Sequence, residues 1–473
     1  MSEQIRLCWV TGGARDCLGE STAGLIANAL EYGHDVSVMI AVDSDEPARL
    51  ERVSGCARKA TTGTAVPTQV INLATVRAFL SADELSGIRN ELEYGLVRSV
   101  EPVFPGNSGV NHNALMLACA GRPYVVSDDD VFAWPAAVGD RDIGRAAGPI
   151  ATDEHQPARL RFCRDRREAM GMVTPLEADL VGLHHGVLGC EMGGPDENAG
   201  QHAKRVVYSS TGSYGDCGMG SPRAILTLEG DDRAAIACED DYRALRLTRE
   251  LVRIAERACV GRGTHLMAMN IGLDNRRPLP PFLSKTRNAD GLVSVLTRII
   301  YPDSVSYVHE VGLLHSPPEP RAFVLEQLRS WRPWPGDLLM GMVVAMAGRL
   351  GTDEPVERMK KLGRELEFLG TLRPSEFVEA VHQRWLATAI AYLSRLEGVL
   401  ERYGNEPVSW AEDVVALIGD IEEKAHDGRL LFGEQGCGLL AGELGEQCRR
   451  YGLLLQVWPQ AWDVARREQL LMP

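Results

Sequence analysis

The sequence predicts an α/β protein, in which a sheet flanked by helices is followed by a part made of helices alone. In residues 1–134, short apolar runs alternate with stretches of helical period, which is typical of βαβ units and a parallel sheet. Residues 135–321 are richer in glycine, proline and arginine and contain shorter elements. In residues 322–473, apolar side chains recur at helical spacing. We therefore expect three parts with these boundaries.

The expected strands of the first part end close to polar residues. The elements are, in order, the strand Ile5–Val10, the helix Ser21–Tyr32, the strand Asp35–Val42, the helix Ser81–Tyr94 with a capping box at Ser81–Glu84, the helix Asn111–Ala120 and the strand Pro123–Val126. Thr11, Asp43 and Asp128–Asp130 follow the three strands. Ligands of such sheets bind beyond the carboxyl ends of the strands, so these residues are candidates for a single site.

The middle part contains one clear amphipathic helix and three expected loops. The helix carries Leu176, Leu180, Leu183 and Val187 on one face, and we interpret His184 and His185 on it as surface residues. The loops are Gly212–Ser221, Asp274–Gly291 and His309–Pro318.

The C-terminal part is expected to be a bundle of helices. One helix carries an apolar stripe from Leu386 to Leu400 and ends near Gly404, and a capping box at Ser409–Glu412 begins another. This part is expected to support the core or to mediate self-association as a homo-oligomer.

Composition and charge exclude several classes of function. Lys and Arg number 50 against 65 Asp and Glu, so the net charge is −15 and neither nucleic acid nor an anionic membrane surface is an expected partner. The 11 cysteines include no Cys-x-x-Cys pair, which excludes a zinc knuckle of that type and does not fit a disulfide framework. With no signal-peptide pattern and no apolar run long enough to span a membrane, we expect a cytoplasmic protein.

The strongest chemical signal is the strand that runs into Asp128-Asp129-Asp130. Three carboxylates at a strand end repel one another unless a cation compensates them. Aspartates one residue apart can bind a hard divalent ion together, with substrate phosphates completing its coordination. The alternative is an exposed acidic turn that caps the next helix.

The segment from Asn111-His112-Asn113 through Gly121-Arg122-Pro123 to Asp128-x-Asp130 resembles the nucleotide-sugar glycosyltransferases of GT-A fold. The likeness is to family 2 and to the polypeptide N-acetylgalactosaminyltransferases, and it covers about residues 5–320. It implies a Rossmann-like mixed sheet, with a nucleotide-sugar-binding part in 1–134 and an acceptor side in 135–321. It also implies nucleotide contacts from Thr11, Arg15, Asp43, Asn113, Asp128 and Asp129, and a metal site.

By the same resemblance, the metal is Mn²⁺ or Mg²⁺ held by Asp128, Asp130 and a late histidine, for which His315 fits better than His309. An imidazole among carboxylates suits Mn²⁺. In the family an acidic residue at the head of a helix serves as general base, and Asp290 matches that position. Asp290 is equally well interpreted as an ordinary helix N-cap.

Two further segments are candidates with plain alternatives. The glycines of Gly215–Gly220 could let backbone amides approach a diphosphate, or form a simple turn. The guanidinium groups of Arg276 and Arg277 could face a diphosphate or an acidic acceptor, or belong to a solvated loop.

The sequence thus predicts a metal-dependent glycosyltransferase that moves a sugar from a nucleotide diphosphate donor, a UDP-sugar first, to an acceptor, with inversion. The acceptor, whether a peptide, a small natural product or a glycan, is left open. One alternative is a sugar nucleotidyltransferase, which shares the sheet and the aspartates. Another is an inactive scaffold, because His112, Arg122 and Ala289 depart from the family pattern.

Overall fold

The computed structural model describes most of the chain. The residues that it describes are 4–12, 16–97, 108–139, 149–152, 159–193, 204–217, 221–261, 269–284, 287–351, 353–432 and 437–468.

One large mixed sheet runs through the molecule. Its strands lie in the order β3 (Thr68–Ile71), β2 (Val36–Val42), β1 (Ile5–Thr11), β4 (Pro123–Asp128), β13 (Asn270–Asp274), β10 (Lys204–Asp216), β14 (Ser304–His315), β12 (Cys259–Gly261) and β6 (Ile150–Thr152). Shorter strands pair at its margins: β5 (Val131–Ala137) with β14 and β8 (Thr174–Pro175), β11 (Glu250–Arg253) with β10 and β7 (Arg161–Phe162), and β9 (Glu191–Met192) with β10.

Strand direction brings distant segments to one edge of this sheet. β1, β2, β3 and β4 are parallel, and β13 is antiparallel to both β4 and β10. β10 therefore runs in the direction of β4, and β14 is parallel to β10. The carboxyl ends of β1, β2, β4, β10 and β14 consequently share one edge, which we call the carboxyl edge.

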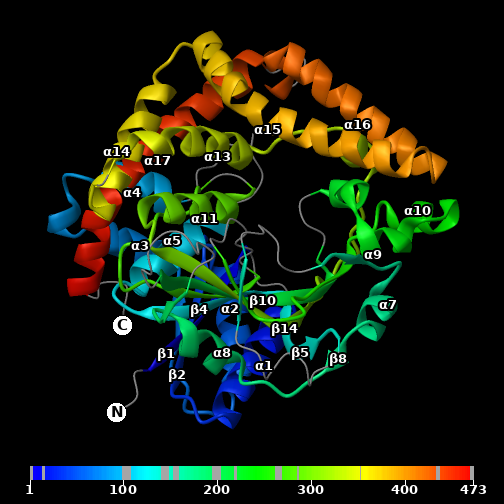
Figure 1. The fold of residues 1–473 in the computed structure, drawn as a ribbon. Coiled ribbons are helices and arrows are strands. Elements are labelled where there is room, and N and C mark those ends of the chain that lie inside the picture. Colours follow the sequence, from blue (N-terminus) through cyan, green and yellow to red (C-terminus); the bar gives the residue numbers. More distant parts are fainter. Residues whose placement is uncertain are drawn as a thin grey trace.

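Helices cover both faces of the sheet (Figure 1). One face packs on α1 (Leu18–Glu31), α2 (Pro47–Ala60) and α8 (Leu180–Val187), and the other on α3 (Leu73–Leu80), α4 (Arg89–Leu96), α5 (Ser108–Ala118) and α11 (Ala289–Ile300). β1 shows why: Leu7 and Trp9 enter the first core, whereas Cys8 and Val10 enter the second. The predicted α/β fold with a mixed sheet and flanking helices is confirmed.

In Figure 1, α13, α15 and α16 lie above α11 and the red helix α17 descends beside α4; the C-terminal helices share the core of α11. They are α12 (Leu325–Arg329), α13 (Pro335–Met346), α14 (Pro355–Gly370), α15 (Pro374–Tyr403), α16 (Val408–His426) and α17 (Cys437–Glu468). The contact of α17 with the sheet part is specific. Tyr451 donates to the carbonyl of Pro281 at 2.6 Å, and Trp458 donates to that of Leu279 at 2.8 Å. Among the described helices, none is long and apolar enough to cross a membrane.

Glycines allow α14 and α17 to pack closely. A Cβ on Gly363 would lie 2.5 Å from the carbonyl oxygen of Gly452, and one on Gly452 would lie 2.4 Å from the backbone nitrogen of Glu367. Any larger residue at either position would therefore separate the two helices.

The expected helix Ser81–Tyr94 is wrong. Asn72 caps α3 by accepting the N–H of Thr75, and Ser81 ends that helix with its N–H on carbonyls of the last turn. A 3₁₀ turn at Asp83–Leu85 follows before α4 begins at Arg89. The Ser81–Glu84 pattern is thus the end of one helix rather than the start of another.

Two expected loops are largely strand, because β10 continues to Asp216 and β14 to His315. Gly212 and Gly312 are paired in the register, and a Cβ on either would lie within 3 Å of Ile254 atoms. Gly212 therefore admits the backbone of Arg253 and Ile254, and Gly312 admits the Ile254 side chain, instead of forming turns.

The Ser409–Glu412 capping box is also wrong, since α16 begins at Val408 after Pro407. The Ser409 side chain instead contacts Glu239 of α10 (Glu239–Leu245). The helix predicted from Leu386 to Leu400 is confirmed as part of α15, with Gly404 as its C-cap. Its predicted apolar stripe is not the buried face, since Ile390 is 59% exposed and Ala389, Leu396 and Val399 are buried instead.

Candidate functional site

The candidate residues at the ends of β1, β2 and β4 lie side by side on the carboxyl edge. Val10 pairs with Asp128, and Thr11 pairs with Val42, the residue before Asp43. Asp43 is buried, with 6% of its surface exposed. Four of the expected polar residues thus lie at neighbouring strand ends: Thr11, Asp43, Asp128 and Asp129.

The three aspartates have different surroundings. Asp129 is buried and accepts a hydrogen bond from Thr11 Oγ1 at 2.8 Å, while the Thr11 carbonyl accepts one from the Asn111 side chain at 3.2 Å. Asp128 is partly exposed, and its backbone N–H donates to the Met269 carbonyl at 2.9 Å. Asp130 is buried and turns toward β14.

His315 faces Asp130 across the carboxyl edge. Its Nε2 lies 3.0 Å from Asp130 Oδ1, and the N–H of Ser316 donates to the Asp130 carbonyl at 2.9 Å. His315 Nδ1 contacts the backbone carbonyl of Asp216. Because a carbonyl oxygen only accepts, Nδ1 carries a proton, and in the neutral ring Nε2 then carries a lone pair. A lone pair and a carboxylate oxygen at this distance require a proton or a cation beside them.

This pair fits a divalent cation. Two neighbouring ligands of an octahedral ion with bonds of about 2.1 Å lie about 3.0 Å apart. Among the described residues, no group of three or more His, Cys, Asp or Glu side chains could hold a metal. Asp128 therefore does not join Asp130 and His315 in a three-residue cluster. Mg²⁺ and Mn²⁺ suit such an incomplete set, because substrate phosphates and water can supply the remaining ligands.

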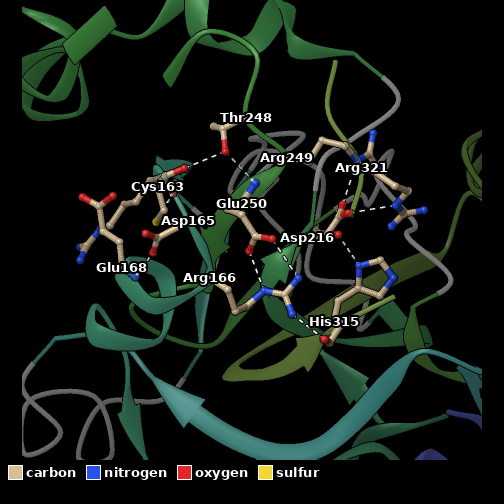
Figure 2. Close-up of polar contacts among 12 residues, drawn as sticks. Cys163, Asp165, Arg166, Glu168, Asp216, Thr248, Arg249, Glu250, His315 and Arg321 are labelled. Carbon is tan, nitrogen blue, oxygen red and sulfur yellow. Dashed lines mark hydrogen bonds and ion pairs between the residues drawn. The ribbon is translucent and has the colours of Figure 1, made fainter. Parts of the chain in front are cut away.

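Arginine side chains surround the Asp216 end of this site (Figure 2). Asp216 Oδ1 accepts from Arg249 Nε, and Oδ2 accepts from Arg321 Nε, each at 2.9 Å. Nearby, Arg166 is bound bidentately by Glu250 at 2.7 and 2.9 Å and donates to Ser316 Oγ at 2.5 Å. Burial lowers the pKa of Arg249, with the charges of Arg321 and Arg287 adding to that effect.

Sequence reasoning missed this arginine set. The glycines around Asp216 predict a diphosphate-binding loop or a simple turn, and nothing local in the sequence links Asp216 to Arg249 or Arg321. The only available signal was that β10 ends at an acidic residue, as β4 does.

Asp290 lies in the first turn of α11 and is half-buried. Arg253 of β11 and Asp290 influence each other: burial lowers the pKa of Arg253 to about 10, and the charges of Cys217 and Asp290 oppose that shift. The N-cap of α11 is Asn288, at φ 62°, so the interpretation of Asp290 as an ordinary N-cap is wrong.

Other sequence candidates lie elsewhere. The Asn113 side chain joins two loops, because it donates to the carbonyls of Gly95 and Phe282 at 2.9 Å and accepts the Phe282 N–H at 2.6 Å. His112 stacks on Phe282 with ring centroids 4.4 Å apart, and burial lowers its pKa to about 4. Arg15 and residues 218–220 of the Gly215–Gly220 segment lie outside the described residues.

Arg276 is placed at the opposite edge of the sheet from Asp130. It donates to Asp274 at 2.6 Å, and Asp274 pairs with Pro123 at the start of β4. Arg277 approaches Asp303 at 3.6 Å. This pair of arginines therefore does not face the site on the carboxyl edge.

The interpretation of His184 as a surface residue is wrong, whereas His185 is exposed as expected. His184 Nδ1 lies 2.9 Å from Ser209 Oγ and Nε2 lies 2.8 Å from Asn270 Oδ1. Ser209 Oγ also lies 2.8 Å from His309 Nε2, so His309 belongs to this buried network and not to the metal candidates.

Comparison with known proteins gives weak likenesses only. No family model matches the chain, and no curated protein matches it. Among solved structures, it is similar to the mannosyltransferase PcManGT from Pyrobaculum calidifontis in complex with GDP-Man and Mn²⁺, at 11% identity and a TM-score of 0.33 over 90% of this chain and 88% of that one. It is also similar to residues 1–349 of S. aureus TarS, at 10% identity and a TM-score of 0.31 over 90% of this chain and 92% of that one.

Proposed function

We propose that the protein is a metal-dependent glycosyltransferase that uses a nucleotide diphosphate sugar, with UDP-sugars as the first donors to test. The observation that carries this proposal is the pair of Asp130 Oδ1 and His315 Nε2, which lie 3.0 Å apart on the carboxyl edge, beside the ends of β1, β2 and β4. With Nδ1 protonated, the contact of Nε2 with the buried carboxylate needs a second ring proton or a cation, and its length fits two neighbouring ligands of one divalent ion. The resemblance of the Asn111–Asp130 segment to GT-A enzymes supplies the reaction class.

In this proposal Thr11 orients Asp129, while Asp43 and Asp128 would contact the base and the ribose. Asp130 and His315 hold Mn²⁺ or Mg²⁺, which when bound offsets negative charge on the diphosphate. The Asp216 carbonyl holds the His315 proton on Nδ1, so that in the neutral ring Nε2 is the nitrogen with the lone pair that would bind the metal.

Asp290 is proposed as the general base. It takes the proton of an acceptor hydroxyl while that oxygen bonds to the anomeric carbon. The bond from that carbon to the diphosphate breaks, and its electron pair leaves with the nucleotide. Attack from the opposite face inverts the configuration. The resemblance to family 2 is the basis for this stereochemistry.

The test is turnover of a panel of UDP- and GDP-sugars with Mn²⁺ or with EDTA, measured as release of nucleoside diphosphate. The proposal expects metal-dependent release with at least one donor. A sugar nucleotidyltransferase would instead release pyrophosphate from a nucleoside triphosphate and a sugar phosphate. A scaffold protein would release neither product, and that result would contradict the proposal.

A further inference from the structure

The Arg249–Asp216–Arg321 cluster has two guanidinium groups on one carboxylate. The Asp216 side chain is 3% exposed, and both arginines bind it through Nε. The neighbouring pair of Arg166 and Glu250 is neutral by itself. The cluster therefore places two guanidinium groups against one carboxylate, in a chain whose net charge is −15.

Both arginines are fixed in place by the backbone around them. The Phe323 N–H donates to the Leu247 carbonyl at 3.1 Å, which ties the segment of Arg321 to that of Arg249. The guanidinium of Arg249 lies over the Phe323 ring, 4.7 Å from its centroid. A fork of two arginines held in this way is preorganised for a planar or tetrahedral oxyanion.

A ligand can reach the cluster through Arg321. Its side chain is 37% exposed, whereas that of Arg249 is 12% exposed. Within the described part of the chain, Asp216 is the one hydrogen-bond partner of Arg321, through Nε. Its terminal NH₂ groups can therefore donate to an incoming anion.

The position of the cluster indicates which substrate it serves. In the sheet order, β10 and β14 lie on the far side of β4 from β1 and β2, where Thr11 and Asp43 end their strands. Asp216 ends β10, and its backbone carbonyl contacts His315 at the end of β14. The cluster thus adjoins His315, on the side of β4 away from β1 and β2 and their proposed nucleotide contacts.

We propose that the Arg249–Asp216–Arg321 cluster is a binding site for an anionic group of the acceptor, a phosphate or a carboxylate. The anion site stands on its own geometry, whereas its assignment to an acceptor rests on the proposed function. The acceptor class narrows accordingly to molecules that carry such a group near the hydroxyl to be glycosylated.

The experiment measures binding of inorganic phosphate and of acetate to the full chain in EDTA, by thermal shift and calorimetry, against sodium chloride of equal ionic strength. We compare wild type with Arg321→Gln, Arg321→Lys and the control Arg332→Gln, whose side chain is 78% exposed and paired with Glu326. Phosphate or acetate should bind wild type and the control alike, about tenfold more weakly to Arg321→Gln, and with intermediate affinity to Arg321→Lys.

A second arm measures binding of UDP and GDP with Mn²⁺. The proposal expects Arg321→Gln to change this binding less than about threefold. Equal weakening of nucleotide and phosphate binding would assign the cluster to the donor diphosphate and overturn the acceptor assignment. Phosphate and acetate binding no stronger than chloride, or unchanged in Arg321→Gln, would overturn the anion site. If anion binding depended on Arg321 but no nucleotide bound, the result would contradict the proposed function and support the anion site.

Discussion

His315 Nε2 and Asp130 Oδ1 lie 3.0 Å apart, although 185 positions separate the two residues in the chain. The strand pairing that joins them is β5 with β14, in which His315 pairs with Val131, the residue after Asp130. The backbone therefore fixes this pair independently of any ligand.

The first prediction concerns the identity of the metal. With one imidazole and one carboxylate from the protein, turnover should be faster with Mn²⁺ than with Mg²⁺ and should stop in EDTA. His315→Asp replaces the nitrogen ligand by an oxygen and should lower the Mn²⁺ to Mg²⁺ activity ratio by about tenfold. Steady-state rates with each metal measure this ratio, and an unchanged ratio would exclude His315 as a ligand.

The second prediction concerns the base. Asp290→Asn removes the carboxylate that would take the acceptor proton and should lower kcat for transfer by about 10²–10⁴-fold. Donor binding should change little, because in the proposed function Asp290 faces the acceptor hydroxyl and not the nucleotide. A loss of donor affinity with kcat preserved would show that Asp290 positions the donor and is not the base.

The third prediction concerns the joint between the helical part and the sheet part. Asp413 of α16 is fully buried and accepts from Tyr242 at 2.7 Å, Arg246 at 3.1 Å and Arg329 at 2.6 Å. Asp413→Ala should destabilise the protein by about 3 kcal/mol. This value is at the low end of what removing one partner of a buried ion pair costs, because both arginines are partly exposed. Urea unfolding measures the loss, and the exposed neighbour variant Glu412→Gln should stay within about 0.5 kcal/mol of wild type.

The fourth prediction concerns acid stability. Burial lowers the pKa of His112 and His184 to about 4 and that of His309 well below its ordinary value. Between about pH 6.5 and pH 4 the unfolded chain binds protons that the folded chain does not, so the free energy of unfolding falls as pH falls. His112→Phe preserves the stack on Phe282 and removes one of these buried neutral histidines. Its free energy of unfolding should therefore fall less steeply with falling pH than that of wild type, by up to about 1.4 kcal/mol per pH unit.

Urea unfolding at several pH values in this window checks the fourth prediction. The variant His185→Gln changes an exposed neighbour of the buried His184 and should follow wild type. If His112→Phe also followed wild type, the buried neutral state of His112 would be wrong.

The sequence predicted best where a signal is local. Apolar runs located β1, β2 and β4, and therefore Thr11, Asp43 and the three aspartates at their ends. The sequence-based predictions failed where the local structure depends on residues that are distant in the chain. Gly212 and Gly312 suggested loops, but each makes room for Ile254 inside long strands. His184 stands four residues after Leu180 on the apolar stripe, so its burial could have been inferred from helical periodicity.

The Asp216 cluster could not have been predicted from the sequence. Its partners are 33 and 105 positions away, and the pairing of β10 with β11 and the contact of Phe323 with Leu247 bring them together. Long-range ion pairs of this kind follow from topology and have no local pattern.

The most direct test of the account is calorimetric titration of nucleoside diphosphates into the protein with Mn²⁺ and with EDTA. We compare wild type with Asp130→Asn and with the control Asp231→Asn, whose side chain is 93% exposed. The account predicts Mn²⁺-dependent binding of one nucleotide to wild type and control, weakened at least about tenfold in Asp130→Asn. Binding of none of the nucleotides, or equal binding with EDTA and in Asp130→Asn, would contradict it.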